Sequence, residues 1–169
     1  MKTLKLMSML FAVALICTAI WAGDEKPWFD LETCAYCKNF NLGNGNYIVD
    51  HMKGHYHTMP KGFLAIMTIE EDYKDEFAKA SEAMTKVGED VAKTGVVPQV
   101  CGHCATFGEL LMAGAASQEF NSDVAMAYMM TSDNPELVTK LHAFAEKNNE
   151  EMAKWDAERA KAKAAKAGK

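Results

Sequence analysis

The stretch Phe63-Leu64-Ala65-Ile66-Met67-Thr68-Ile69 decides the expected fold, because it is apolar at nearly every position. A run of this length without regular polar alternation is typical of a central strand that is covered on both faces. The turn Pro60-Lys61-Gly62 comes directly before it. Residues 48–58 and 63–69 are therefore predicted to form a hairpin.

An amphipathic helix is predicted directly after this hairpin, over residues 70–93. Gly95 follows it and is expected to end the helix. The apolar residues of the segment recur every three or four positions, which places one stripe against a core. The members of this stripe are Tyr73, Phe77, Ala80, Met84, Val87 and Val91.

The second half of the chain repeats this order. After a helix-compatible run at 105–116, residues 117–120 and 124–131 predict another hairpin, and a long helix opens at Pro135. The second strand of each hairpin ends in Met-Thr, with an offset of 63 residues (130 − 67). Two ββα-like halves predict an α+β fold with an antiparallel sheet of about four strands packed by helices. This arrangement is similar in outline to a ferredoxin-like sandwich.

Each half is preceded by a CxxC pair, Cys34-Ala35-Tyr36-Cys37 and Cys101-Gly102-His103-Cys104. If a pseudo-twofold axis relates the halves, the two pairs occupy equivalent places and their four sulfurs meet. Zinc accepts four thiolates in a tetrahedron, so Cys34, Cys37, Cys101 and Cys104 are the predicted metal ligands. The pairs are separated by 63 residues (101 − 37 − 1), far more than the roughly 15 to 20 of compact zinc ribbons. Convergence of the pairs therefore depends on the repeat.

The letters CGHC also resemble the dithiol active site of protein disulfide isomerases. The resemblance covers four residues and implies a thiol-disulfide activity that uses Cys101 and Cys104. A helix from Ala105 would place Cys101 at a helix N-terminus, which lowers a thiol pKa. No βαβ unit precedes the motif, so a thioredoxin fold is not expected. A metal site, a redox dithiol and structural disulfides within or between the pairs all remain open.

Three histidines form a second candidate site. His51, His55 and His57 share a parity, so on a strand they would point to one face, with Met52 and Met59 nearby. Imidazole and thioether groups together predict copper as the ion for such a site. The sequence favours the other interpretation, in which the three histidines form the polar outer face of an edge strand.

The first 22 residues have the order of a secretory signal peptide: Lys2 and Lys5, then the apolar run 6–21, then Ala22. A membrane anchor is the alternative, but a run of about 16 residues is short for a span. We therefore expect cleavage after Ala22 and a secreted or periplasmic protein that has no membrane anchor afterwards.

The mature chain is expected to be one domain at 23–156, followed by a polar Ala/Lys-rich helical tail at 157–169. Its net charge changes from −5 to −7 when the two lysines of the signal are removed. This acidity disfavours nucleic acid as a partner. The chain has no nucleophile elbow and no phosphate-binding glycine loop, so we expect a binding, sensing or metal-handling role rather than an enzyme. If the protein is an enzyme, we expect a thiol-disulfide oxidoreductase.

Overall fold

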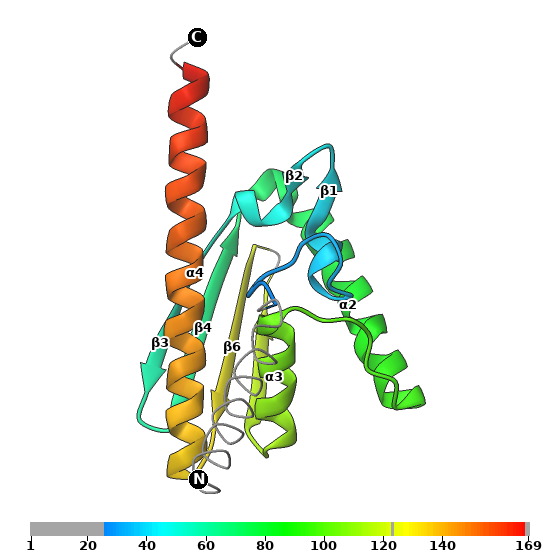
Figure 1. Cartoon of the computed structure of the whole chain (residues 1–169), viewed down its shortest axis with the longest axis vertical. Coiled ribbons are helices and arrows are strands. Elements are labelled where there is room, and N and C mark those ends of the chain that lie inside the picture. Colours follow the sequence, from blue (N-terminus) through cyan, green and yellow to red (C-terminus); the bar gives the residue numbers. More distant parts are fainter. Residues whose placement is uncertain (1–25, 123, 168–169) are drawn as a thin grey trace, which may run out of the picture.

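The structure is a computed structural model that describes residues 26–122 and 124–167 (Figure 1). The predicted signal peptide at 1–22 lies outside these residues. The 3-10 helices (η), strands and α-helices follow one another as η1 (Cys37–Phe40), β1 (Asn41–Gly43), β2 (Asn46–Tyr47), η2 (Ile48–His51), β3 (Met52–Met59), β4 (Gly62–Ile69), η3 (Glu71–Tyr73), α2 (Lys74–Thr94), α3 (Gly102–Met112), β5 (Ala116–Asn121), β6 (Ala125–Thr131) and α4 (Pro135–Ala167).

Two hairpins lie side by side and form one sheet of four strands in the order β3-β4-β6-β5. Every neighbouring pair of strands is antiparallel. The α+β fold with a four-stranded antiparallel sheet and a long C-terminal helix is therefore confirmed. Strands β1 and β2 form a separate, smaller hairpin.

The register between β4 and β6 has the symmetry that the repeat predicts. With an offset of 63 residues, Phe63 corresponds to Met126 and Met67 corresponds to Met130. In the sheet, Phe63 lies opposite Met130 and Met67 lies opposite Met126. A twofold axis through the opposed pair Ala65 and Tyr128 requires this pattern, because it places each residue opposite the counterpart of its partner.

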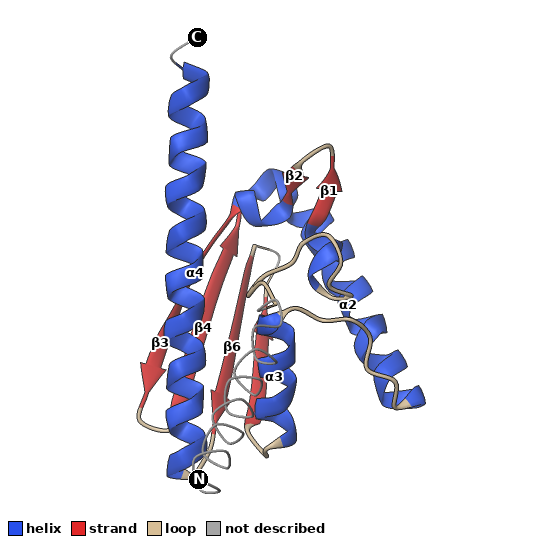
Figure 2. Ribbon diagram, in the orientation of Figure 1, coloured by secondary structure: helices blue, strands red, loops and turns tan. Residues whose placement is uncertain are grey.

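Helices α3 and α4 cover one face of the sheet (Figures 1 and 2). The main core lies between them and the strands, and each large apolar side chain buried there stabilises the fold by roughly 1.5–3 kcal/mol. Its members are Tyr56, Phe63, Ala65, Tyr128 and Met130 from the sheet, Leu110 and Ala115 from α3 and the turn after it, and Leu137, Leu141, Phe144 and Ala145 from α4.

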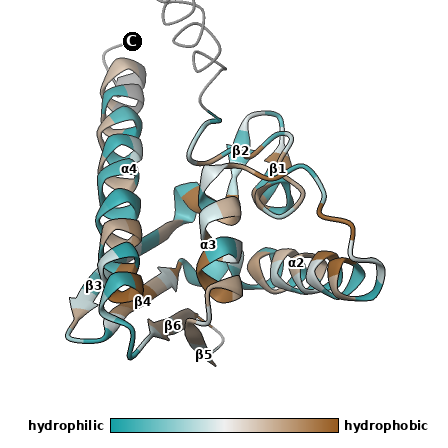
Figure 3. Cartoon of the chain, turned by 60° about the horizontal axis from the view of Figure 1, so that its bottom comes forward, coloured by the Kyte–Doolittle hydropathy of each residue, from teal (hydrophilic) through white to brown (hydrophobic). Residues whose placement is uncertain are grey.

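Helix α4 begins where the sequence predicts, at Pro135, and the backbone N–H of Glu136 donates a 2.9 Å hydrogen bond to the Asn134 side chain. The helix continues beyond the sheet as far as Ala167, and this extension is mostly hydrophilic (Figure 3). In the described ranges, no helix combines the length and the apolar character that crossing a membrane requires.

The prediction that β4 is covered on both faces is wrong. Ile66 points away from α3 and α4 and is 42% exposed, and its cross-strand neighbour His55 is exposed as well. Apolar residues on both sides of a strand indicate burial, but here the two covering helices pack on the same side. The opposite face of the sheet is the more open one.

Helix α2 has the predicted bounds to within a few residues, but it packs away from the sheet (Figures 1 and 3). Phe77 and Ala80 pack with Ile48 and Ile69 at the end of the first hairpin. The rest of α2 lies beside η1, and of the six predicted stripe residues only Ala80 is fully buried. Gly95 ends the helix in the left-handed conformation, with φ of 70°.

Candidate metal centre

The two CxxC pairs have the same local form. Cys37 is the first residue of η1, and Cys101 directly precedes α3. In each pair the carbonyl of the first cysteine accepts a 3.0 Å hydrogen bond from the backbone N–H four residues later. Each pair therefore turns back on itself at the start of a helical segment, and both of its sulfurs face the same side.

The four sulfurs converge, as the repeat predicts. The Sγ–Sγ distances are 3.7 Å for Cys34 and Cys104, 3.6 Å for Cys37 and Cys101, and 3.5 Å for Cys37 and Cys104. All four atoms lie within 4.8 Å of one another. A tetrahedral ion with sulfur at about 2.3 Å requires sulfur–sulfur edges of about 3.8 Å. The cluster therefore has the size of a site for one metal ion.

The cluster is shielded from solvent. Cys34, Cys37 and Cys101 are buried, and Cys104 is partly buried. All four are free cysteines, and the sulfur separations above are far longer than the roughly 2.05 Å of a disulfide bond. Disulfides within or between the pairs have no support from this arrangement.

Crowding of the thiols shifts their pKa values in opposite directions. The pKa of Cys34 is lowered, chiefly because the Cys101 thiol donates a hydrogen bond to the Cys34 thiolate. The pKa of Cys101 is lowered to about 7, chiefly by a hydrogen bond from Cys104. The pKa values of Cys37 and Cys104 are raised, because these thiols act as donors to their neighbours and burial disfavours further negative charge. A cation among the sulfurs supplies the charge that lets all four deprotonate.

The segment before the first pair holds the second pair in place. The backbone N–H groups of Gly102 and His103 donate hydrogen bonds of 3.0 and 2.8 Å to the carbonyls of Pro27 and Trp28. These N–H groups lie in the first turn of α3, where a helix has no partner of its own for them. This segment, residues 26–33 and here called the leader, supplies acceptors to the start of α3 and positions Cys101.

His103 lies between the two cysteines in sequence, but its ring is directed at α4. Its Nδ1 lies 2.7 Å from the Oδ1 of Asn148, and because an amide oxygen only accepts, Nδ1 is the donor. Burial lowers the pKa of His103 to about 4, so the ring is neutral at neutral pH. His103 therefore connects the second CxxC pair to α4 and does not belong to the sulfur cluster.

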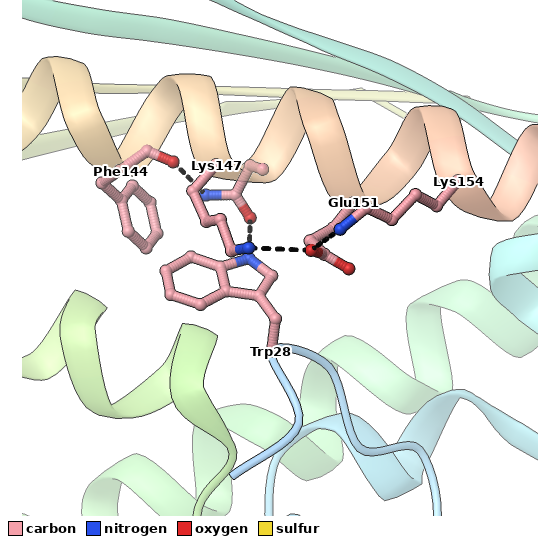
Figure 4. A network of polar contacts seen from close by, with 6 residues as sticks. Trp28, Phe144, Lys147, Glu151 and Lys154 are labelled. Carbon is pink, nitrogen blue, oxygen red and sulfur yellow. Dashed lines mark hydrogen bonds and ion pairs between the residues drawn. The ribbon is translucent and has the colours of Figure 1, made fainter. Parts of the chain in front are cut away.

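Sequence reasoning did not identify Asn148, which is fully buried within α4. Its Oδ1 also accepts a 3.2 Å hydrogen bond from the Trp28 indole, and its Nδ2 donates to the carbonyl of Phe144 at 2.8 Å (Figure 4). Its position could have indicated a buried polar contact, because Asn148 is a polar residue in the apolar stripe of α4, between Phe144 and Met152.

The three histidines of the second candidate site are not brought together. His51 lies in η2, where its Nδ1 is 2.8 Å from a Glu70 carboxylate oxygen and its ring stacks on Tyr73. His55 and His57 share the open face of β3, with ring centroids 4.6 Å apart. Within the described residues, the sulfur cluster is the only group of three or more potential metal ligands.

The fold and the cysteine cluster together define this chain as an α+β protein with a candidate four-sulfur metal site. The chain matches no protein family, no curated protein and no solved structure.

Proposed function

We propose that the protein is an exported metal-binding protein that holds one zinc ion through Cys34, Cys37, Cys101 and Cys104. The observation that carries this proposal is the set of sulfur–sulfur distances of 3.5 to 3.7 Å, close to the edge of a zinc–thiolate tetrahedron. Copper is the alternative ion, because thiolates also bind Cu(I).

A site with four protein ligands leaves no open position for a substrate, which is the pattern of a structural rather than a catalytic zinc. The ion would join the loop before η1 to the start of α3 and so link the two halves of the chain. We infer a role in metal binding, sensing or handling. Export rests on the charged, apolar and small residues of 1–22 and would give a mature chain beginning at Gly23.

The experiment is metal analysis and intact mass of the protein purified from its native compartment. We expect one zinc ion per chain, four free thiols after denaturation and a mass that begins at Gly23. Cys34→Ser should lose the zinc, because a three-sulfur set with a buried hydroxyl binds the ion poorly. The matched control, His55→Ala with His57→Ala, should keep it, because both rings lie on the open face of β3.

A thiol-disulfide protein is the second candidate function. Cys101 at the start of α3, with a pKa lowered to about 7, favours it. A mass lower by about four protons with no bound metal would overturn the zinc proposal and support two disulfides. Redox activity would further require a reduction potential above that of structural disulfides.

A further inference from the structure

A second candidate site lies beside the sulfur cluster. A cavity of about 890 Å³ opens between α4, α3 and the covered face of the sheet. This volume falls within the range of about 300–1,000 Å³ that is typical of small-molecule sites. Cys37 and Cys104 form part of its wall, but the cavity extends well beyond them along the sheet and α4.

The wall of the cavity suits an apolar ligand without a net charge. Five methionines contribute to it, and flexible thioether side chains adapt to ligands of different shape; they are Met52, Met67, Met84, Met126 and Met152. Aromatic side chains such as Phe107 and Trp155 complete the apolar surface. The carboxylates in the wall and Lys53 are on exposed residues at its mouth, and the half-buried Arg159 guanidinium is paired with Asp156.

A buried hydroxyl pair gives the cavity a polar anchor. Tyr128 donates a 2.7 Å hydrogen bond to the hydroxyl oxygen of Tyr56, and both residues contribute to the wall. They are 9% and 4% exposed. Two hydroxyls carry two hydrogens, and the bond between them uses one. The hydrogen of the Tyr56 hydroxyl is therefore available to an acceptor that enters the cavity, and a buried donor gains from such a partner.

The second hydrogen stays on the pair under ordinary conditions. Burial raises the pKa values of both Tyr56 and Tyr128 well above the usual value of a tyrosine. The pair therefore offers a hydrogen-bond donor, and not an anion, to whatever enters the cavity.

We propose that this cavity binds an uncharged apolar molecule whose carbonyl oxygen accepts the second hydrogen of the Tyr56–Tyr128 pair. The apolar wall holds the body of the ligand, and the hydroxyl pair selects a molecule with an acceptor. This binding activity is separate from metal binding, and the zinc content of each variant reports on the metal site independently.

The test uses two neutral fluorescent probes, prodan, which carries a ketone, and dimethylaminonaphthalene, which lacks it. Titrated into the full mature chain, prodan should shift its emission to the blue and bind about five- to tenfold more tightly than the second probe, the effect of one hydrogen bond. A failure of prodan to bind, or equal affinity for both probes, would overturn the proposal.

Four variants locate the binding. Tyr56→Phe and Tyr128→Phe should each keep the preference for prodan, because the remaining hydroxyl still has a hydrogen to donate, and the double variant should lose it. Gly108 lies in the cavity wall on α3, and a Cβ added there would meet no atom within 4 Å. Gly108→Phe should therefore narrow the cavity and lower the affinity for both probes at least tenfold.

The zinc content and the circular dichroism of each variant show that it is folded. Unchanged binding of both probes to Gly108→Phe would place them elsewhere, such as the open face of the sheet, and would contradict the proposal. A preference for prodan that survives in the double variant would do the same. If the double variant does not fold, the response of Gly108→Phe decides.

Discussion

Asn148 joins three parts of the molecule through one buried amide. The indole of Trp28 reaches it from the leader, the ring of His103 reaches it from the second CxxC pair, and its own Nδ2 is bonded within α4. Beside it, the ammonium of Lys147 lies 5.9 Å from the centroid of the Trp28 ring (Figure 4). A single polar residue in an apolar stripe therefore holds the leader and the metal centre against the long helix.

Replacing this amide should destabilise the fold. Asn148→Leu keeps the approximate volume but leaves the N–H groups of Trp28 and His103 without their acceptor. We expect a loss of about 2–4 kcal/mol, the penalty for two partly or fully buried unsatisfied donors. Urea unfolding measures it, with Asn46→Leu as the control, because Asn46 is exposed in β2. A loss no larger than that of the control would contradict this role for Asn148.

Residues such as Asn148 mark where prediction from sequence stopped. The periodicity of α4 indicates an interruption of the apolar stripe, but it does not identify the partners, which lie 120 and 45 residues away in the chain. The contacts among the cysteines could be predicted, because the two CxxC pairs have the same spacing and each comes before the same order of elements. That internal consistency is what made the convergence of four sulfurs predictable.

At the scale of elements, hairpins and helices followed from local pattern, whereas their neighbours did not. The Pro60-Lys61-Gly62 turn and the apolar run after it place the β3–β4 hairpin, and Gly95 places the end of α2. An apolar stripe on a helix or an apolar face on a strand indicates that another element covers it, but it does not identify that element. Nothing local to the sequence of α2 distinguishes packing on η1 from packing on the sheet, and nothing in β4 tells which of its faces α4 will occupy.

Strand β3 is an edge strand, and α4 covers part of its free edge. The side chain of Asn149 accepts a 2.8 Å hydrogen bond from the N–H of Tyr56 and donates one of 2.8 Å to its carbonyl. These are the two bonds that a neighbouring strand would make. An edge without such cover presents unpaired backbone groups to other chains.

Asn149→Ala should open this edge. We expect hydrogen exchange of the Tyr56 amide to accelerate about fivefold or more, because one hydrogen bond of about 1 kcal/mol is lost there. The variant should also self-associate more readily at high concentration. Exchange followed residue by residue measures the first effect, and Glu150→Ala, one position further on the exposed side of α4, is the control. Exchange at Tyr56 that equals that of the control would refute the role of Asn149.

For the whole molecule, the sheet and the cysteine site link the two halves in different ways. The β4–β6 pairing lies at the pseudo-twofold axis and joins the hairpins through backbone hydrogen bonds. The sulfur cluster joins what lies outside the sheet, namely the loop that leads into η1 and the start of α3. Because α2 packs on η1 and on the end of the first hairpin rather than on the face of the sheet, its place in the molecule depends partly on the segment that the cluster holds.

Removal of the proposed zinc should therefore reduce protection from hydrogen exchange more in some parts of the molecule than in others. With the ion at 100 to 1,000 times its dissociation constant, chelation removes about 3–4 kcal/mol of stability, which lowers Tm by about 10 °C for a chain of this size. Hydrogen exchange should increase first at 34–47 and in α2, while β4 and β6 stay protected, because their bonds and core contacts with α4 do not involve the cysteines. Calorimetry with and without a chelator measures the first effect, and peptide-resolved exchange measures the second. Equal loss of protection in the sheet and in α2 would mean that the ion stabilises the fold as one unit, and no change in Tm would mean that the four sulfurs hold no ion.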